Sequence, residues 1–118
     1  MMLKCLILSY AASNASQIAG LISGLEQLNG NNYVSWKERL EITLALLGID
    51  YALLNDPPVE PNVGVNDYEN LKRDYQKKKE KWEESNRKCL MIIKSSIVEG
   101  IRGAIPEAQS AREYLANV

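Results

Sequence analysis

The residues best suited to bind a ligand lie in one basic run, residues 72–82, which includes aromatic side chains. Tyr75 and Trp82 lie within or beside this run, and acidic residues such as Asp74, Glu80 and Glu84 are mixed into it at helical spacing. Lysine and arginine can neutralise RNA phosphates and release counterions. Mixed charges at helical spacing are also typical of an ordinary solvated helix face, which we favour here. The candidate nucleic-acid contacts are Lys72, Arg73, Lys77, Lys78, Lys79 and Lys81.

Few residues are arranged in a way that suits catalysis or metal binding. The sequence contains no histidine, which removes the commonest general base and the commonest metal ligand. Cys5 and Cys89 lack the close spacing of a zinc or redox motif. Adjacent carboxylates such as Glu83 and Glu84 point in different directions on a helix, and no phosphate-binding glycine motif is present. We therefore expect no enzymatic activity, no cofactor and no metal.

Length and composition indicate one small domain after a short leader. A chain of 118 residues can bury a real core, and its net charge of -1 gives no overall attraction to nucleic acid or membrane. Residues 1–16 resemble a weak secretory signal, but their apolar run is too short to span a bilayer. We expect residues 1–27 to be a leader that is disordered or marginally helical. We also expect both cysteines to be reduced, the protein to be cytoplasmic, and no membrane partner.

Helical periodicity predicts the first stable element. Apolar residues recur at spacings of three and four over residues 32–48, after a turn at Gly30 and before a glycine at Gly48. The side chain of Asn31 or Asn32 is expected to cap this helix by accepting a hydrogen bond from its first turn. The apolar stripe consists of Tyr33, Trp36, Leu40, Leu44 and Leu47.

Prolines separate this helix from a longer one. Residues 55–64 contain three prolines and are predicted to form a loop. Asn66 or Asp67 then begins a helix reaching to about Val98, and the capping box from Ser110 to Glu113 opens a last helix. We therefore predict an all-α fold, a small helical bundle with a Pro-rich loop between the second and third helices. The expected seam of the long helix is Leu71, Tyr75, Lys78, Trp82, Asn86, Cys89, Ile93 and Ile97, and the expected core is Tyr33, Trp36, Leu40, Leu44, Trp82, Leu90 and Ile93.

Three blocks of the sequence resemble the N-terminal, capsid-like part of copia-type LTR-retrotransposon Gag polypeptides. The first block, L-x-G-x-N-Y-x-x-W, is carried by Leu28, Gly30, Asn32, Tyr33 and Trp36. The second, W-x3-N-x3-L, is carried by Trp82, Asn86 and Leu90, with Ile93 in the apolar residues that follow. The third, an I-P … A-x-x-x-L continuation, is carried by Ile105, Pro106, Ala111 and Leu115. The resemblance covers roughly residues 25–118, and the order and spacing of the blocks make it specific.

The resemblance implies a structural domain of a transposable element that oligomerises into capsid-type assemblies around RNA. It implies that residues 28–118 are a Gag-like helical domain truncated at its C-terminus. The zinc knuckle of full-length members is absent, because the chain has no histidine and only two cysteines. We expect Tyr114, Leu115 and Val118 to be left partly exposed. Two alternatives stay open: a sequence-nonspecific RNA-binding helix through residues 72–81, and an unrelated helical interaction module.

Overall fold

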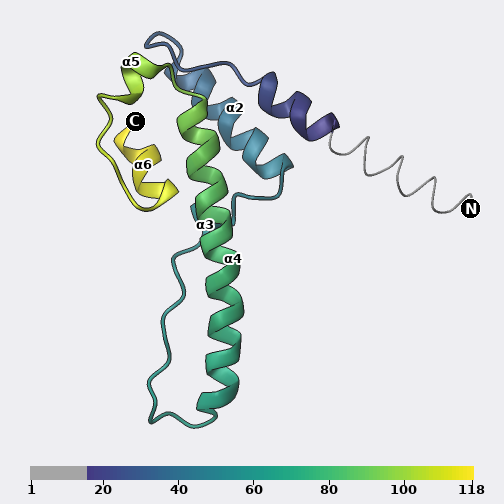
Figure 1. Ribbon diagram of the computed structural model, residues 1–118, viewed down its shortest axis with the longest axis vertical. Coiled ribbons are helices and arrows are strands. Elements are labelled where there is room, and N and C mark those ends of the chain that lie inside the picture. The colour runs from purple at the N-terminus through teal and green to yellow at the C-terminus, as the bar shows by residue number, and fades with distance from the viewer. Residues whose placement is uncertain (1–15) are drawn as a thin grey trace, which may run out of the picture.

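The computed structural model describes residues 16–118, which contain six helices and no β-strand (Figure 1). Residues 16–23 are helical, and they are followed by α2 (Tyr33–Leu46), α3 (Tyr51–Leu54), α4 (Tyr68–Ser95), α5 (Glu99–Arg102) and α6 (Ala111–Asn117). The predicted all-α fold is confirmed. The predictions for residues 1–15, including the signal-like run and the reduced state of Cys5, lie outside the described residues.

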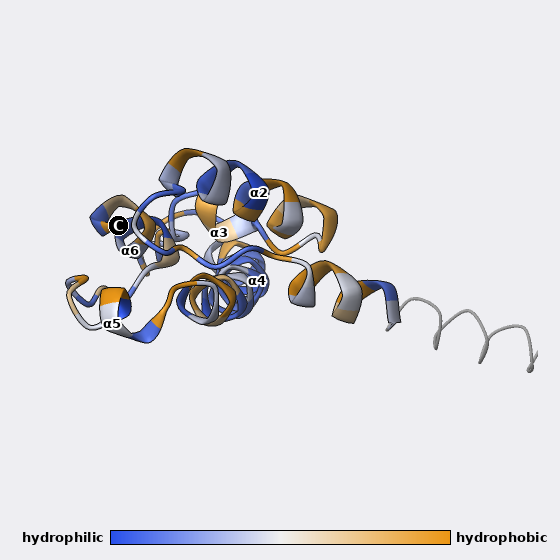
Figure 2. Cartoon of the chain, turned by 90° about the horizontal axis from the view of Figure 1, so that it is seen from above, coloured by the Kyte–Doolittle hydropathy of each residue, from blue (hydrophilic) through white to orange (hydrophobic). Residues whose placement is uncertain are grey.

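Helix α4 is the axis on which the other elements are arranged. In Figure 1, α2 and α6 lie beside its C-terminal half, and α3 lies near its middle. Figure 2, which looks along α4, shows α2 and α6 around it and the helix of residues 16–23 projecting to one side. The N-terminal half of α4 extends beyond this bundle, with only the loop of residues 55–67 running alongside (Figure 1). We call residues 55–84, this loop and half-helix, the arm.

The core lies where α2, the C-terminal half of α4 and α6 meet. Its members are Leu28, Trp36, Leu40, Leu44, Cys89, Ile93, Ile97, Ala111, Tyr114 and Leu115. Trp36, Leu40, Leu44 and Ile93 are fully buried, as expected for core residues. Tyr33 is 41% exposed instead, because it lies in the first turn of α2, with its ring centroid 6.2 Å from that of Trp36 and the two planes tilted by 36°. Leu90 is half-buried and packs against this cluster, whereas Trp82 is half-buried farther along α4 and is not the core residue that the sequence predicted.

The predicted seam of α4 holds only in the part of the helix that other helices cover. Cys89 and Ile93 are buried, whereas Leu71 is 44% exposed and Lys78 points into solvent. Within the part of α4 that belongs to the arm, the half-buried residues are Tyr68, Tyr75 and Trp82, which recur every seven residues on one side of the helix. A loop covers less of a helix than a second helix does. The arm therefore buries only these three aromatic side chains in part, and not the whole predicted seam.

Two boundaries near the end of the chain differ from the prediction. Helix α4 ends at Ser95 rather than Val98, because Ile97 forms a parallel bridge with Leu28 and leaves the helical path. Tyr114 is fully buried and Leu115 is only 9% exposed, so the expected exposure of these two side chains is wrong. They are covered because α6 folds back onto α4 and α3. Val118 is half-buried against the same cluster.

Candidate functional site

The first sequence block, residues 28–36, packs against the end of α4. The backbone N–H of Leu28 donates to the carbonyl of Ser96 at 2.7 Å, and the N–H of Val98 donates to the carbonyl of Leu28 at 3.2 Å. The indole N–H of Trp36 donates to the Ser96 carbonyl at 3.0 Å and lies 3.1 Å from its hydroxyl. These contacts join segments that are 60 or more residues apart, so they hold two distant parts of the chain together. We call the hydrogen bonds of Leu28 and Trp36 to residues 96–98 the lock.

The turn of this block is held by its asparagines. Gly30 has a φ of +96°, which a residue with a side chain rarely adopts. The Asn32 side chain accepts from the N–H of Asn29 at 3.0 Å and donates to the carbonyl of Gln27 at 2.9 Å. The predicted side-chain cap of α2 is therefore wrong, since Asn32 closes the turn behind it and makes no cap hydrogen bond to the helix.

Asn86 of the second block positions the start of α6. Its amide donates to the carbonyl of Gln109 at 2.9 Å, and its side-chain oxygen accepts from the N–H of Ala111 at 2.7 Å. The predicted cap at Ser110 is present, with its hydroxyl accepting from the N–H of Glu113 at 3.1 Å. Asn86 and Ser110 thus satisfy two N–H groups at the first turn of α6, where no backbone partner exists.

Other residues of the second and third blocks hold loops in place. The indole N–H of Trp82 donates to the carbonyl of Asn55 at 3.0 Å and fixes the start of the Pro-rich loop. The carbonyl of Pro106 accepts from the side chain of Asn117 at 3.1 Å, so it contacts the end of α6. These two contacts are structural as well.

Ser85 and Cys89 form a polar contact that sequence reasoning missed. The Ser85 hydroxyl donates to the carbonyl of Ile49 and accepts from the N–H of Ala52 at 2.9 Å, while the Cys89 thiol donates to the same Ile49 carbonyl at 2.9 Å. Burial raises the pKa of Cys89 to about 11, which keeps it a thiol rather than a nucleophilic thiolate. The four-residue spacing of a serine and a cysteine on one helix was the only available signal.

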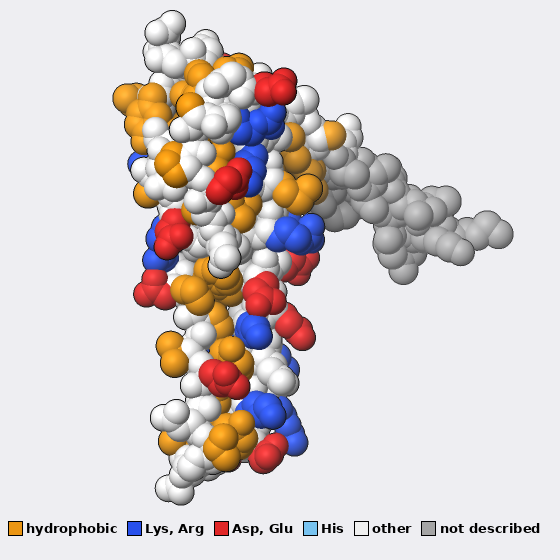
Figure 3. Space-filling view, turned by 60° about the vertical axis from the view of Figure 1, so that its left-hand side comes forward, with side chains coloured by type: hydrophobic (Ala, Val, Ile, Leu, Met, Phe, Trp, Pro, Cys, Tyr) orange, Lys and Arg blue, Asp and Glu red, His pale blue; other side chains and the backbone are white. Residues whose placement is uncertain are grey.

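The basic candidates lie on the arm without forming a single positive face. Lys72 lies 5.9 Å from the ring centroid of Tyr68, Lys79 lies 6.0 Å from that of Tyr75, and Lys81 lies 4.3 Å from that of Tyr51. Figure 3 shows blue and red side chains interspersed along the arm. All six candidates, Lys72, Arg73, Lys77, Lys78, Lys79 and Lys81, are exposed.

Charge pairing on the arm weakens its positive field. Lys78 pairs with Asp74 at 3.0 Å, and this hydrogen bond raises the pKa of Lys78. Residues 68–84 contain six basic and five acidic side chains, a net charge of +1. The structure therefore brings the predicted cations onto one half-helix but mixes them with nearly as many carboxylates.

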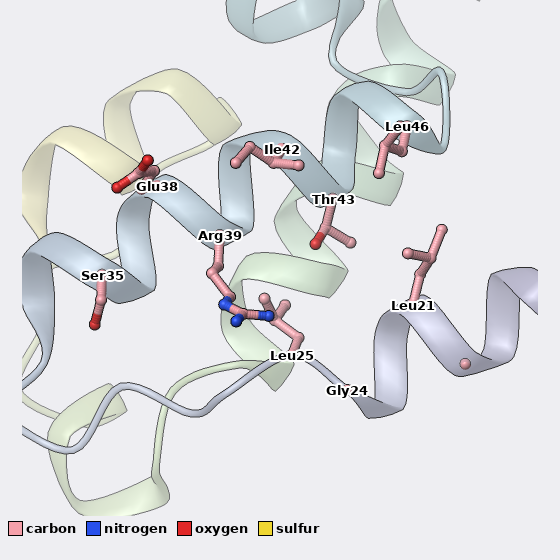
Figure 4. Close-up of a pocket in the computed structure, with 10 residues that line it drawn as sticks. Leu21, Gly24, Leu25, Ser35, Glu38, Arg39, Ile42, Thr43 and Leu46 are labelled. Carbon is pink, nitrogen blue, oxygen red and sulfur yellow. The ribbon is translucent and has the colours of Figure 1, made fainter.

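A groove of about 580 Å³ lies between α2 and the helix of residues 16–23, and we call it the α2 groove (Figure 4). Leu46 and Thr43 point across it toward Leu21, and Arg39 extends from α2 toward Leu25. The full lining is Gly20, Leu21, Gly24, Leu25, Ser35, Glu38, Arg39, Ile42, Thr43 and Leu46. Nothing in the prediction pointed to this groove, because residues 16–27 were expected to be at most marginally helical.

Comparisons with protein-family models, curated proteins and solved structures found no match to this chain. Within residues 16–118, no cluster of three or more histidine, cysteine or acidic side chains could hold a metal ion. Over the same residues, no helix combines the length and the apolar character needed to cross a membrane.

Proposed function

We propose that this chain is a structural, self-associating domain of the Gag type that takes part in capsid-like assembly and acts without catalysis. The observation that carries the proposal is that the residues of the Gag-like sequence blocks make contacts that hold the fold together. Trp36 and Leu28 lock onto the end of α4, Asn86 positions α6, and Trp82 holds the Pro-rich loop. Residues that maintain a fold are what an assembly module requires.

Exposed apolar side chains support self-association. Ile42 is 52% exposed and Leu46 is 67% exposed on α2, and Met91 on α4 is 61% exposed. Ile18 and Ile22 are each 39% exposed on the neighbouring helix. Ile42 and Leu46 line the α2 groove, and Ile18, Ile22 and Met91 line a second groove. Exposed apolar patches with polar surroundings are typical of protein–protein contacts. The proposal also places the protein in the cytoplasm, which is consistent with Cys89 being a buried free thiol.

Light scattering coupled to size-exclusion chromatography tests this proposal. We expect the mean mass to rise with protein concentration beyond that of the 13.2 kDa chain. Because the proposed contacts are apolar, association should persist at high salt. A mass that stays at one chain over the whole concentration range would contradict the proposal.

A second candidate function is sequence-nonspecific RNA binding by the arm. The observation that favours it is the row of exposed lysines beside tyrosine rings at Tyr68, Tyr75 and Tyr51, on a segment that extends away from the bundle. Phosphate contacts release counterions, so affinity should fall steeply with salt. Binding that is insensitive to salt would contradict phosphate contact through these lysines.

Paired charge variants sharpen the RNA experiment. Replacing Lys72, Lys77 and Lys79 with glutamine should weaken binding and reduce the salt slope by about 0.7 for each lost contact to single-stranded RNA. The matched control replaces Glu69, Glu80 and Glu83 with glutamine, which should strengthen binding because it raises the positive charge of the same surface. Equal affinities for both variants would exclude the arm as the RNA site.

A further inference from the structure

The α2 groove lies beside an apolar ridge on the same face of the molecule. Helix α2 buries Trp36, Leu40 and Leu44 against the core and leaves Ile42 and Leu46 exposed on its other side. Both exposed residues also line the α2 groove. One face of the molecule therefore carries both the α2 groove and exposed apolar side chains of a size to occupy the same groove on another molecule.

We propose that a second copy of this chain docks into the α2 groove through a two-fold contact, in which Ile42 and Leu46 of each copy enter the groove of the other. This inference deepens the proposed self-association by naming its surface, and it rests on that proposal. A two-fold interface uses the same patch on both partners, so the patch must offer protruding and hollow parts together. The α2 groove and its ridge meet that requirement.

Charge complementarity also favours a second copy as the occupant. Glu38 and Arg39 are adjacent, both line the groove, and neither forms an ion pair with another described residue. A two-fold axis passing between them brings Glu38 of each copy toward Arg39 of the other. The groove thus presents one acidic and one basic group at its rim beside apolar walls, and an identical face supplies the complement of each.

Gly20 provides a way to fill the groove without disturbing the fold. A Cβ added at Gly20 meets no atom within 4 Å, whereas one at Gly24 would lie 3.1 Å from the carbonyl oxygen of Gly20. Gly20 is helical, so replacing it with leucine should favour the helix while its side chain occupies the groove. Gly100 in α5 is the matched control, since a Cβ there also meets nothing within 4 Å.

The first experiment compares Gly20→Leu with Gly100→Leu in the full chain by sedimentation equilibrium. We expect Gly20→Leu to raise the dissociation constant of the dimer by about tenfold or more, because it occupies space that the partner needs. Gly100→Leu should leave that constant unchanged, and helical circular dichroism should show that both variants fold. Association of the Gly20→Leu variant equal to that of the unsubstituted chain would overturn the inference, while leaving self-association through another surface in place.

The second experiment uses charge reversal. Arg39→Glu and Glu38→Arg should each weaken the self-association of their own variant by about tenfold or more, because like charges then face one another. Mixing the two variants should restore association, since each copy then supplies the charge that the other needs. Absence of this rescue would overturn the two-fold arrangement.

Two further outcomes separate the inference from the proposed function. If the unsubstituted chain is a monomer at every concentration, both the inference and the proposed self-association are wrong. If Gly20→Leu lowers the melting temperature of the monomer and leaves association intact, then the copies associate without using the α2 groove. That result would overturn docking of a second copy at this place.

Discussion

The indole N–H of Trp36 lies 3.0 Å from the carbonyl oxygen of Ser96, in a contact that is fully buried. The same carbonyl accepts the backbone N–H of Leu28 at 2.7 Å. The turn before α2, the helix itself and the end of α4 therefore converge on one acceptor. A buried acceptor shared by two donors makes this junction sensitive to the loss of either.

Trp36 should be the most costly single truncation in α2. Trp36→Ala is expected to lower the free energy of unfolding by about 3–5 kcal/mol, because it removes a fully buried aromatic side chain. Trp36→Phe should cost about 1–3 kcal/mol through loss of the indole donor and ring volume. Tyr33→Ala, at a 41% exposed position of the same helix, is the control and should cost less than about 1 kcal/mol. Urea denaturation measures all three, and a Trp36→Ala cost as small as that of the control would refute the lock.

Asn86 should control the attachment of α6. Asn86→Ala removes the hydrogen bonds to Gln109 and Ala111 and should lower the free energy of unfolding by about 1–3 kcal/mol. Hydrogen exchange should become faster in α6 before it does so in α2. Asn70→Ala, which removes only an exposed bond to Asp67, is the control. Uniform acceleration across the molecule would argue against a local role for Asn86.

Asp67 occupies a strained position at the start of α4. Its φ is +62°, the only positive value at a non-glycine residue among the described residues. Asp67→Val should therefore lower the free energy of unfolding by about 1–2 kcal/mol, since a branched side chain tolerates this conformation poorly. Asp67→Gly should be nearly neutral, as it relieves the strain but loses the bond from Asn70. Asn66→Val tests whether bulk alone explains the loss, and an equal effect at that position would exclude strain.

The Cys89 thiol should make stability depend on alkaline pH. Its pKa is about 11 in the folded protein and about 8.5 in an unfolded chain. The unfolded state loses its proton first, so the stabilisation is complete below about pH 8.5 and is lost as pH rises toward about 11. Urea denaturation of a Cys5→Ser variant should show the free energy of unfolding falling between about pH 8.5 and about pH 11. Adding Cys89→Ala should remove the part of this fall that is due to Cys89. A thiol reagent should modify the folded protein only slowly at neutral pH, and rapid modification would contradict the raised pKa.

Local sequence signals determined the bounds of α2 and the starts of α4 and α6 to within one or two residues. Helix α2 was predicted over residues 32–48 and spans Tyr33–Leu46, since apolar spacing and a following glycine act within a few residues. Ser110 was predicted to cap the last helix and does so through Glu113. The all-α class follows from the same local patterns. These features depend on neighbours in the chain, which the sequence displays directly.

Contacts between distant segments decided what the sequence left open. Asn32 turns back to Gln27 instead of capping α2, and Tyr114 rather than Tyr33 fills the core, because α6 returns to cover α4. The α2 groove exists only because the helix of residues 16–23 lies beside α2. Periodicity shows that a side chain is apolar on one face of a helix, but burial depends on which other helix reaches that face. The sequence alone determined the all-α class, because helical periodicity is a local property of the chain. The tertiary structure decided which apolar residues form the core and which remain exposed.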